Sequence, residues 1–138
     1  MPRVFVYGTL RAGEVNDLNR AAERHGIAAP TLQGIGTIPG RLYDFGTYPG
    51  LVLDATAGPV VGDIYEIPDA LLPVLDEIEE VYPGQATLFV RESRAVMLNG
   101  TPQDCLLYPV AESAVEGLAR IDGGDWVAYR RARDTAAA

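Results

Sequence analysis

The sequence predicts an α+β domain in which short strands close into a small barrel or strongly curved sheet, with helices beside it. Residues 31–67 are short apolar runs broken by glycine and proline, the punctuation of an all-β region. Asn99-Gly100 indicates a hairpin, and residues 69–81 carry apolar side chains at helical spacing. At 138 residues and 48% hydrophobic content, the chain has the size and composition of a single domain.

The first predicted strand leads into a tight turn. Residues 3–7 are β-branched, aromatic or basic, and the run stops at Gly8. A glycine there lets backbone N–H groups face open space, where they can bind a carboxylate or an oxyanion. The turn alone favours the alternative, a glycine that only starts a loop.

The next elements are a helix and a set of strands. The spacing of apolar residues predicts a helix from about Val15 to His25, with His25 as a cap residue and Gly26 ending it. Strands are expected at residues 33–38, 41–45, 51–53 and 60–67. The glycines of residues 34–40 only superficially match a dinucleotide-binding loop, since Pro39 would interrupt the following helix, so no nucleotide cofactor is expected.

The best helical pattern runs from Asp69 to Val81, with Asp69 as the expected N-cap and Pro73 in or near the first turn. Its apolar face consists of Leu71, Val74, Leu75, Ile78 and Val81.

Glu79 is the one acidic residue of this helix that leans toward the apolar face. At about 100° per residue it falls between Leu72 and Leu75, whereas Asp76, Glu77 and Glu80 fall outside the face. Apolar surroundings raise a carboxyl pKa, which suits a group that takes and returns a proton near neutral pH. The alternative is a carboxylate at the edge of the face that reaches into water.

The last third of the chain predicts a turn at residues 82–84, strands at 86–98 and 102–110, and a short helix within 111–121. Trp126 is interpreted as a core anchor. We expect one domain over residues 1–130, followed by a frayed tail at 131–138.

Composition excludes several classes of partner. The net charge of −8 and pI near 4.5 argue against nucleic acid or an anionic membrane surface, and Arg130 to Arg133 are interpreted as part of a solvated tail. A single cysteine, Cys105, cannot form an intrachain disulfide and is interpreted as a small buried hydrophobe. With no leader or membrane-length apolar run, a cytoplasmic protein is expected. Oligomeric state is not indicated.

Several segments together resemble the γ-glutamylcyclotransferase-like superfamily, which includes the avirulence-induced-protein-like branch. They are spread over most of the chain in a consistent order: residues 4–11 (Val-Phe-Val-Tyr-Gly-Thr-Leu-Arg), 40–43, 48–50, 61–65, 75–79 (Leu-Asp-Glu-Ile-Glu) and 124–126 (Gly-Asp-Trp).

The resemblance implies a small mixed β-barrel with flanking helices, a γ-glutamylcyclotransferase-like fold. It implies that Tyr7, Gly8, Thr9 and Leu10 line the substrate cavity and that Glu79 is the catalytic acid/base. No cofactor or metal is expected, because the sequence has no metal-ligand cluster and no phosphate loop. The implied reaction cyclises a small-molecule γ-glutamyl amide to 5-oxoproline and releases an amine or amino acid. The leaving amine is left open, as are a non-catalytic binding or interaction domain on the same fold and a hydrolase.

Two positions depart from the family pattern. Glu80 stands where glycine usually follows the catalytic glutamate, and Phe89 stands where the family favours tyrosine, two places before Arg91. A second carboxylate would raise the pKa of Glu79 further or alter the loop, and Phe89 removes a possible hydrogen bond to the substrate.

Overall fold

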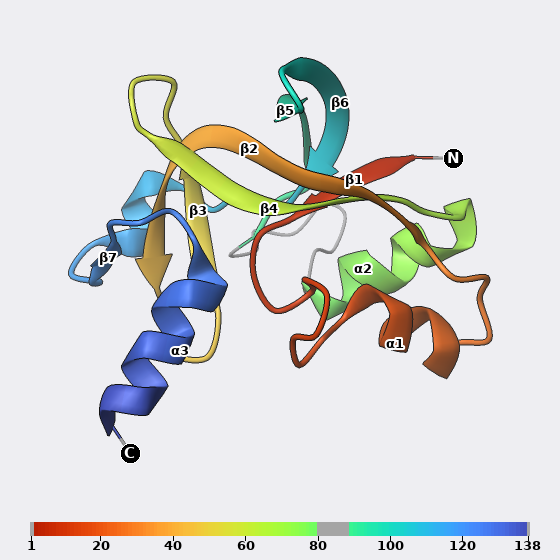
Figure 1. Ribbon diagram of the computed structural model, residues 1–138, viewed down its shortest axis with the longest axis horizontal. Helices are drawn as coiled ribbons and strands as arrows, with labels where there is room; N and C mark the ends of the chain where they lie inside the picture. Colours follow the sequence, from red (N-terminus) through yellow and green to blue (C-terminus); the bar gives the residue numbers. More distant parts are fainter. Residues whose placement is uncertain (1, 80–88, 138) are drawn as a thin grey trace.

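The computed structural model describes residues 2–79 and 89–137 (Figure 1). The described strands are β1 (Arg3–Val6), β2 (Thr31–Asp44), β3 (Pro49–Leu53), β4 (Pro59–Glu66), β5 (Glu92–Leu98), β6 (Thr101–Leu107) and β7 (Arg120–Ile121). The helices are α1 (Leu18–Arg24), α2 (Leu72–Ile78) and α3 (Trp126–Ala137), with short 3₁₀ turns η1 (Asp69–Leu71) and η2 (Glu112–Val115).

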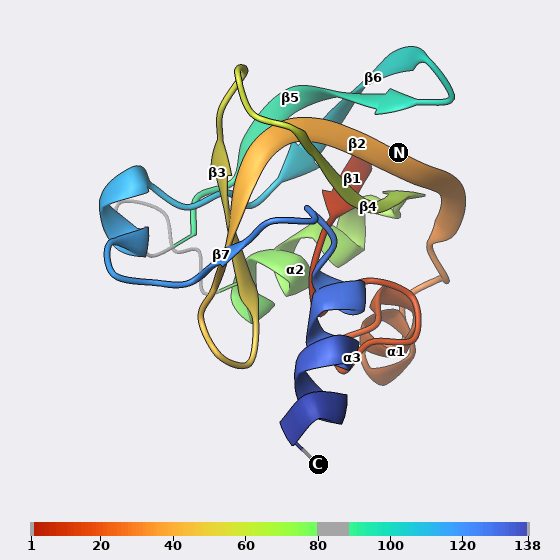
Figure 2. The same cartoon turned by 60° about the vertical axis from the view of Figure 1, so that its left-hand side comes forward.

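The strands close into a mixed barrel, as predicted. Around the barrel the order is β2, β4, β1, β6 and β5, and β5 returns to β2 through the pair Thr37 and Met97. Strands β1 and β6 are parallel, and the other neighbours are antiparallel. The second half of β2 also pairs with β3 and β7. Helices α1 and α2 lie together on one side of the barrel, and α3 lies on the other side in Figure 1. Figure 2 shows α3 next to α1 and the loop that precedes it.

Strand β2 corrects the prediction of two strands at residues 33–38 and 41–45, because it continues through Pro39 and Gly40. Pro39 is the last residue paired with β4, and Gly40 is the first paired with β3. A proline lacks the N–H that a ladder needs, so it is tolerated where one partner strand ends. The exchange of partners therefore occurs within one continuous strand.

Helix α1 begins later than predicted. The side chain of Asp17 caps it by accepting a hydrogen bond from the Asn19 N–H (2.9 Å), and Val15 lies outside the helix with 70% of its surface exposed. Its C-terminal end agrees with the prediction, with His25 as the C-cap and Gly26 in the left-handed region (φ 64°).

The helix predicted from Asp69 to Val81 is divided into η1 and α2. Asp69 is not an N-cap: the residue before η1 is Pro68, which makes no side-chain capping bond. Pro73 does lie in the first turn of α2, and Glu79 is the C-cap. Val81 lies outside the described residues.

The hairpin at Asn99-Gly100 is confirmed, and both residues have positive φ (51° and 81°). Strand β5 begins at Glu92, and the first residues predicted for it, 86–88, lie outside the described part of the chain, as does the predicted turn at 82–84. The short helix predicted within residues 111–121 is present as the 3₁₀ turn η2, and β7 forms near the end of the same segment.

The C-terminal segment is helical rather than a solvated tail. Helix α3 continues to Ala137 and crosses the expected domain end at residue 130. Arg130 pairs with Glu14, and Arg133 pairs with Asp44, so the basic residues dock the helix. The interpretation of Arg130 and Arg133 as part of a solvated tail is therefore wrong, because both residues pair with carboxylates that are distant in sequence.

Two apolar clusters form the core. One fills the barrel and includes Phe5, Cys105 and Trp126, with the tryptophan fully buried as predicted. The other lies against α1 and α2 and includes Leu18 and Leu75. Among residues 2–79 and 89–137, no helix is long and apolar enough to cross a membrane.

Leu75→Ala should lower the free energy of unfolding by about 2–5 kcal/mol, because it removes a fully buried side chain and leaves a cavity. Val15→Ala, at an exposed site, should change it by less than about 0.5 kcal/mol. Urea denaturation compares them, and equal losses would contradict the arrangement of α1 and α2.

Candidate active site

A pocket opens where β1 ends. It encloses about 350 Å³, counting its open mouth, and among the described residues that line it Glu79 is the only acidic or basic one. The lining residues are Phe5, Val6, Tyr7, Gly8, Thr9, Leu10, Tyr48, Pro49, Glu79, Phe89 and Tyr108. The five residues singled out from the sequence, at positions 7–10 and 79, are thus brought together.

The turn after β1 is closed by a hydrogen bond from the Arg11 N–H to the Gly8 carbonyl (3.1 Å). Gly8 packs against the ring of Pro49, and a Cβ atom at Gly8 would lie 2.7 Å from Pro49 Cγ and Cδ. This close approach explains the glycine, since even alanine would force the turn away from β3.

We call Gly8, Thr9 and Leu10 the cradle. Their carbonyls accept hydrogen bonds from the N–H groups of Arg11 (3.1 Å), Asn16 (2.8 Å) and Leu18 (3.2 Å). Their own N–H groups donate to no residue that the structure describes. Because Gly8 and Leu10 are buried, these donors favour a bound acceptor such as a carboxylate or an oxyanion.

Tyr7 lines the pocket, but its hydroxyl group makes hydrogen bonds that stabilise the fold. The hydroxyl donates to the Tyr108 carbonyl (2.6 Å) and accepts from the Leu51 N–H (3.3 Å). Burial, and then the nearby charge of Glu79, raise the pKa of Tyr7 well above its ordinary value, while the Leu51 N–H lowers it. Tyr7 therefore remains a neutral tyrosine that joins β1 to β3 and to the segment after β6.

Glu79 lies at the C-terminal end of α2, with its N–H bonded to the Leu75 carbonyl (2.9 Å). Its carboxyl group is partly buried in the pocket and has no hydrogen-bond or ion-pair partner among the described residues. Burial raises the pKa of Glu79 from about 4.5 to about 7, in the direction that its place between Leu72 and Leu75 predicts. Glu80 lies outside the described residues.

The sequence analysis did not identify Tyr108 and Asp76. The Tyr108 hydroxyl donates to Asp76 Oδ1 (2.7 Å), and Arg91 Nη1 donates to Asp76 Oδ2 (2.6 Å). Burial, then the hydrogen bond to Asp76, raise the pKa of Tyr108. Asp76 is one helical turn before Glu79, and the helical spacing correctly predicts that it lies outside the apolar face. The same spacing cannot predict that Tyr108, from another part of the chain, lies beside it.

Aromatic rings form one wall of the pocket. Tyr48 stacks on Phe45, with centroids 5.3 Å apart, and is tilted against Phe89 at 5.8 Å. The segments 40–43 and 48–50, which contribute to the family resemblance, contain one tyrosine each. Of these two, Tyr48 lines the pocket. Tyr43 instead accepts a hydrogen bond from Arg41 Nη1 (2.8 Å) outside it.

The raised pKa of Glu79 predicts a pH-dependent stability. The unfolded carboxyl ionises near pH 4.5 and the folded one near 7, so the folded state binds more protons in this window and stability falls as the pH rises through it. Each unit of separation is worth about 1.4 kcal/mol. Glu79→Gln should therefore be more stable than the wild type at pH 8 and similar to it at pH 4.

Denaturation with urea across this pH range measures the effect. Glu77→Gln, which removes an exposed carboxylate from the same helix, should keep the wild-type slope. If Glu79→Gln also kept that slope, the carboxyl group would not be buried in the way described.

Comparison with known proteins identifies the family. A profile of the γ-glutamyl cyclotransferase, AIG2-like family matches residues 4–128. The chain is 41% identical over 86 residues to γ-L-glutamyl-butirosin B γ-glutamyl cyclotransferase of Niallia circulans, a match that covers 61% of this chain and 50% of that protein. The chain thus spans about half the length of this relative.

Other relatives match over most of their length. The γ-glutamylcyclotransferase family protein YtfP of Escherichia coli K12 is 31% identical over 126 residues, covering 91% of this chain and 96% of YtfP. Mouse γ-glutamylaminecyclotransferase is 30% identical over 129 residues, covering 86% and 84%.

Solved structures agree in fold. A mouse AIG2-like protein superimposes with a TM-score of 0.72 at 26% identity, covering 88% of this chain and 86% of that one. Protein PH0828 of Pyrococcus horikoshii superimposes with a TM-score of 0.70 at 22% identity, covering 98% of both chains. The profile match over residues 4–128 shows that this protein belongs to the γ-glutamyl cyclotransferase, AIG2-like family.

Proposed function

We propose that this protein cyclises a γ-glutamyl amide to 5-oxoproline and releases an amine or amino acid. The observation that carries the proposal is the meeting of unpaired cradle N–H groups and the partly buried carboxyl of Glu79 in one pocket. Donors for an anion and a proton carrier with a pKa near neutrality are what such a cyclisation requires.

The cradle would hold the substrate by its carboxylate or by the oxyanion that develops on the γ-carbonyl oxygen. The nucleophile is the substrate's own α-amine, so no enzyme nucleophile is needed. Folding the substrate until this amine faces the γ-carbonyl supplies much of the acceleration, because the attack is intramolecular. The aromatic wall of Tyr48 and Phe89 would exclude water from this conformer.

Glu79 would carry the protons. Its carboxylate takes a proton from the α-ammonium, the amine forms the new C–N bond, and the γ-amide C–N bond then breaks as Glu79 returns the proton to the departing nitrogen. Overall the α-nitrogen loses two protons and the departing nitrogen gains two, so Glu79 ends the cycle ionised. Burial of Glu79 places its pKa near the pH at which it can act in both directions.

The leaving amine is the open part of the proposal. Three classes of substrate are to be tested. The names of two relatives suggest γ-glutamylamines and γ-L-glutamyl-butirosin B, and γ-glutamyl dipeptides are the third class. Incubation of the purified protein with each, followed by mass spectrometry for 5-oxoproline, tests the reaction. Formation of glutamate instead of 5-oxoproline would indicate a hydrolase. Absence of any product from all three substrates would favour a non-catalytic binding domain.

Glu79→Gln should lower kcat by about a hundredfold to ten-thousandfold while substrate binding is retained, because the amide fills the same space but cannot take up and return a proton. Single-turnover rates and equilibrium binding separate the two effects. Glu77→Gln is the control and should remain active. Near-normal turnover by Glu79→Gln would exclude the proposed role.

The pH profile gives a second prediction. Since the free enzyme must present an ionised Glu79, kcat/KM should fall as the pH drops through about 7. Initial rates between pH 5 and pH 9 measure this limb. A profile flat across neutrality would show that another group carries the proton.

A further inference from the structure

We propose that helix α3 is a positioning element for the cradle, acting through two ion pairs that join the helix to residues 11–17. The inference rests on the proposed function for its catalytic consequence, although its structural part can be tested without any substrate. The family profile ends at residue 128, whereas one of the two ion pairs uses Arg130.

The first ion pair begins at Arg11, the residue after the cradle. Arg11 Nη2 donates to Asp63 Oδ1 (3.3 Å), and the N–H of the next residue donates to Asp63 Oδ2 (3.0 Å). Arg11 Nη1 donates to Asp125 Oδ1 (3.2 Å). Asp63, whose side chain is 8% exposed, thus holds the loop to β4, while Asp125 holds the same guanidinium to the start of α3.

Asp125 also caps α3. Its Oδ1 accepts from the Ala128 N–H (3.2 Å), and its carbonyl accepts from the Tyr129 N–H (3.1 Å). The Asp125 carboxylate therefore fixes the start of α3 and also binds Arg11. A shift of the helix start would therefore move Arg11, and a shift of Arg11 would move the helix start.

The second ion pair joins Glu14 to Arg130, one turn further along α3. Arg130 Nε donates to Oε1 (3.0 Å) and Nη2 to Oε2 (2.9 Å), the two-bond geometry that gives such pairs directional strength. The Glu14 side chain is only 5% exposed, and its N–H donates to the Arg11 carbonyl (3.0 Å). A carboxylate this buried requires its partner.

Few buried side chains hold this loop. Between the buried side chains of Leu10 and Leu18, Glu14 is the only buried residue. Helix α3 is itself anchored to the barrel, by buried Trp126 and by Arg133, which donates to Asp44 (3.2 Å) and to the Gly46 carbonyl (2.6 Å). The helix thus connects a rigid part of the barrel to the segment that carries the cradle.

Amide hydrogen exchange tests the structural part directly. The N–H groups of Arg11, Asn16 and Leu18 each donate to a cradle carbonyl, so their exchange rates report the stability of the cradle backbone. In Arg130→Gln these amides should exchange about tenfold faster, since local opening becomes easier. The Val110 N–H, bonded to the Leu51 carbonyl, should be unchanged.

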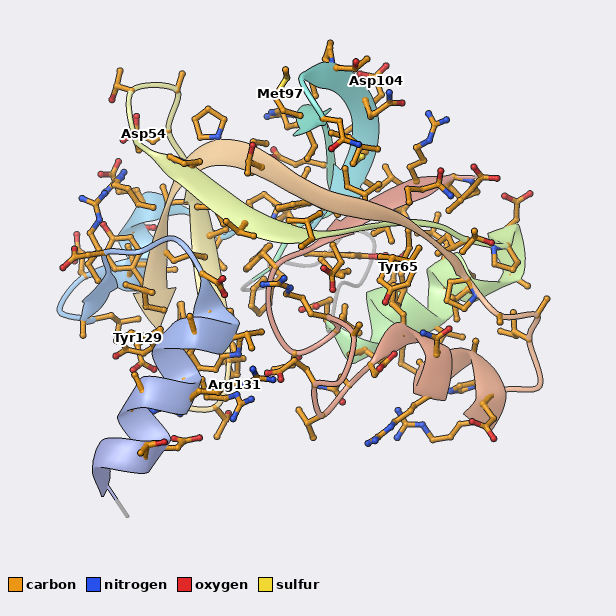
Figure 3. All side chains as sticks on the ribbon, in the orientation of Figure 1. Asp54, Tyr65, Met97, Asp104, Tyr129 and Arg131 are labelled. Atoms are coloured by element: carbon orange, nitrogen blue, oxygen red, sulfur yellow. The ribbon has the colours of Figure 1, made fainter. Side chains whose placement is uncertain are left out.

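The control is Arg131→Gln on the same helix, labelled in Figure 3, because Arg131 is exposed and its side chain makes no hydrogen bond or ion pair with a described residue. It should leave all of these rates as in the wild type. Unchanged exchange at Arg11, Asn16 and Leu18 in Arg130→Gln would overturn the proposal, as would an equal increase at Val110, which would indicate global destabilisation.

Measurements of kcat/KM test whether α3 affects catalysis. On any substrate that yields 5-oxoproline, Arg130→Gln and Glu14→Gln should each lower kcat/KM about tenfold, and the double variant should lose no more than either single variant, because both break one ion pair. Normal kcat/KM despite faster exchange would overturn the catalytic consequence alone. Absence of 5-oxoproline with the wild type would contradict the proposed function and leave the exchange result to decide the role of α3.

Discussion

The structure around the pocket depends on one buried hydroxyl. Tyr7 ends the first barrel strand, and its hydroxyl satisfies both the Tyr108 carbonyl and the Leu51 N–H. A phenyl ring would leave these two backbone groups without this partner in a buried region, at a cost of about 1–3 kcal/mol for each unsatisfied group. The hydrogen bonds also fix the direction in which the chain leaves β1. The cradle, Glu79 and the aromatic wall face one another because of that direction.

Local patterns predicted the elements whose causes are local. The positive φ of Asn99 and Gly100 and the cap at Gly26 follow from residue chemistry within a few positions. The continuity of β2 through Pro39 does not, since it depends on β4 ending where β3 begins. The docking of Arg130 is similar. Its partner, Glu14, is 116 residues away. Nothing in the sequence around Arg130 indicates that it pairs with a buried carboxylate.

The candidate site shows the same division. Helical phase singled out Glu79, and the turn chemistry singled out Gly8, because each property is contained in a short stretch of chain. Tyr108 was missed since its place in the pocket follows from the register of β6 against β1. Asp63 and Asp125 stood in segments used for the family resemblance, yet only the fold shows that both contact Arg11. These contacts join strands and loops that are distant in sequence, so no short stretch of the chain predicts them.

The parallel pairing of β1 with β6 has a consequence for synthesis of the chain. Val4 leaves the ribosome before its partner on this side, Leu106, which comes much later in the chain. The contacts that hold the following loop come from Asp63, Asp125 and Arg130. The turn after β1 is therefore synthesised well before the residues that hold its loop in place, so the pocket of a nascent chain stays unformed until those residues have emerged.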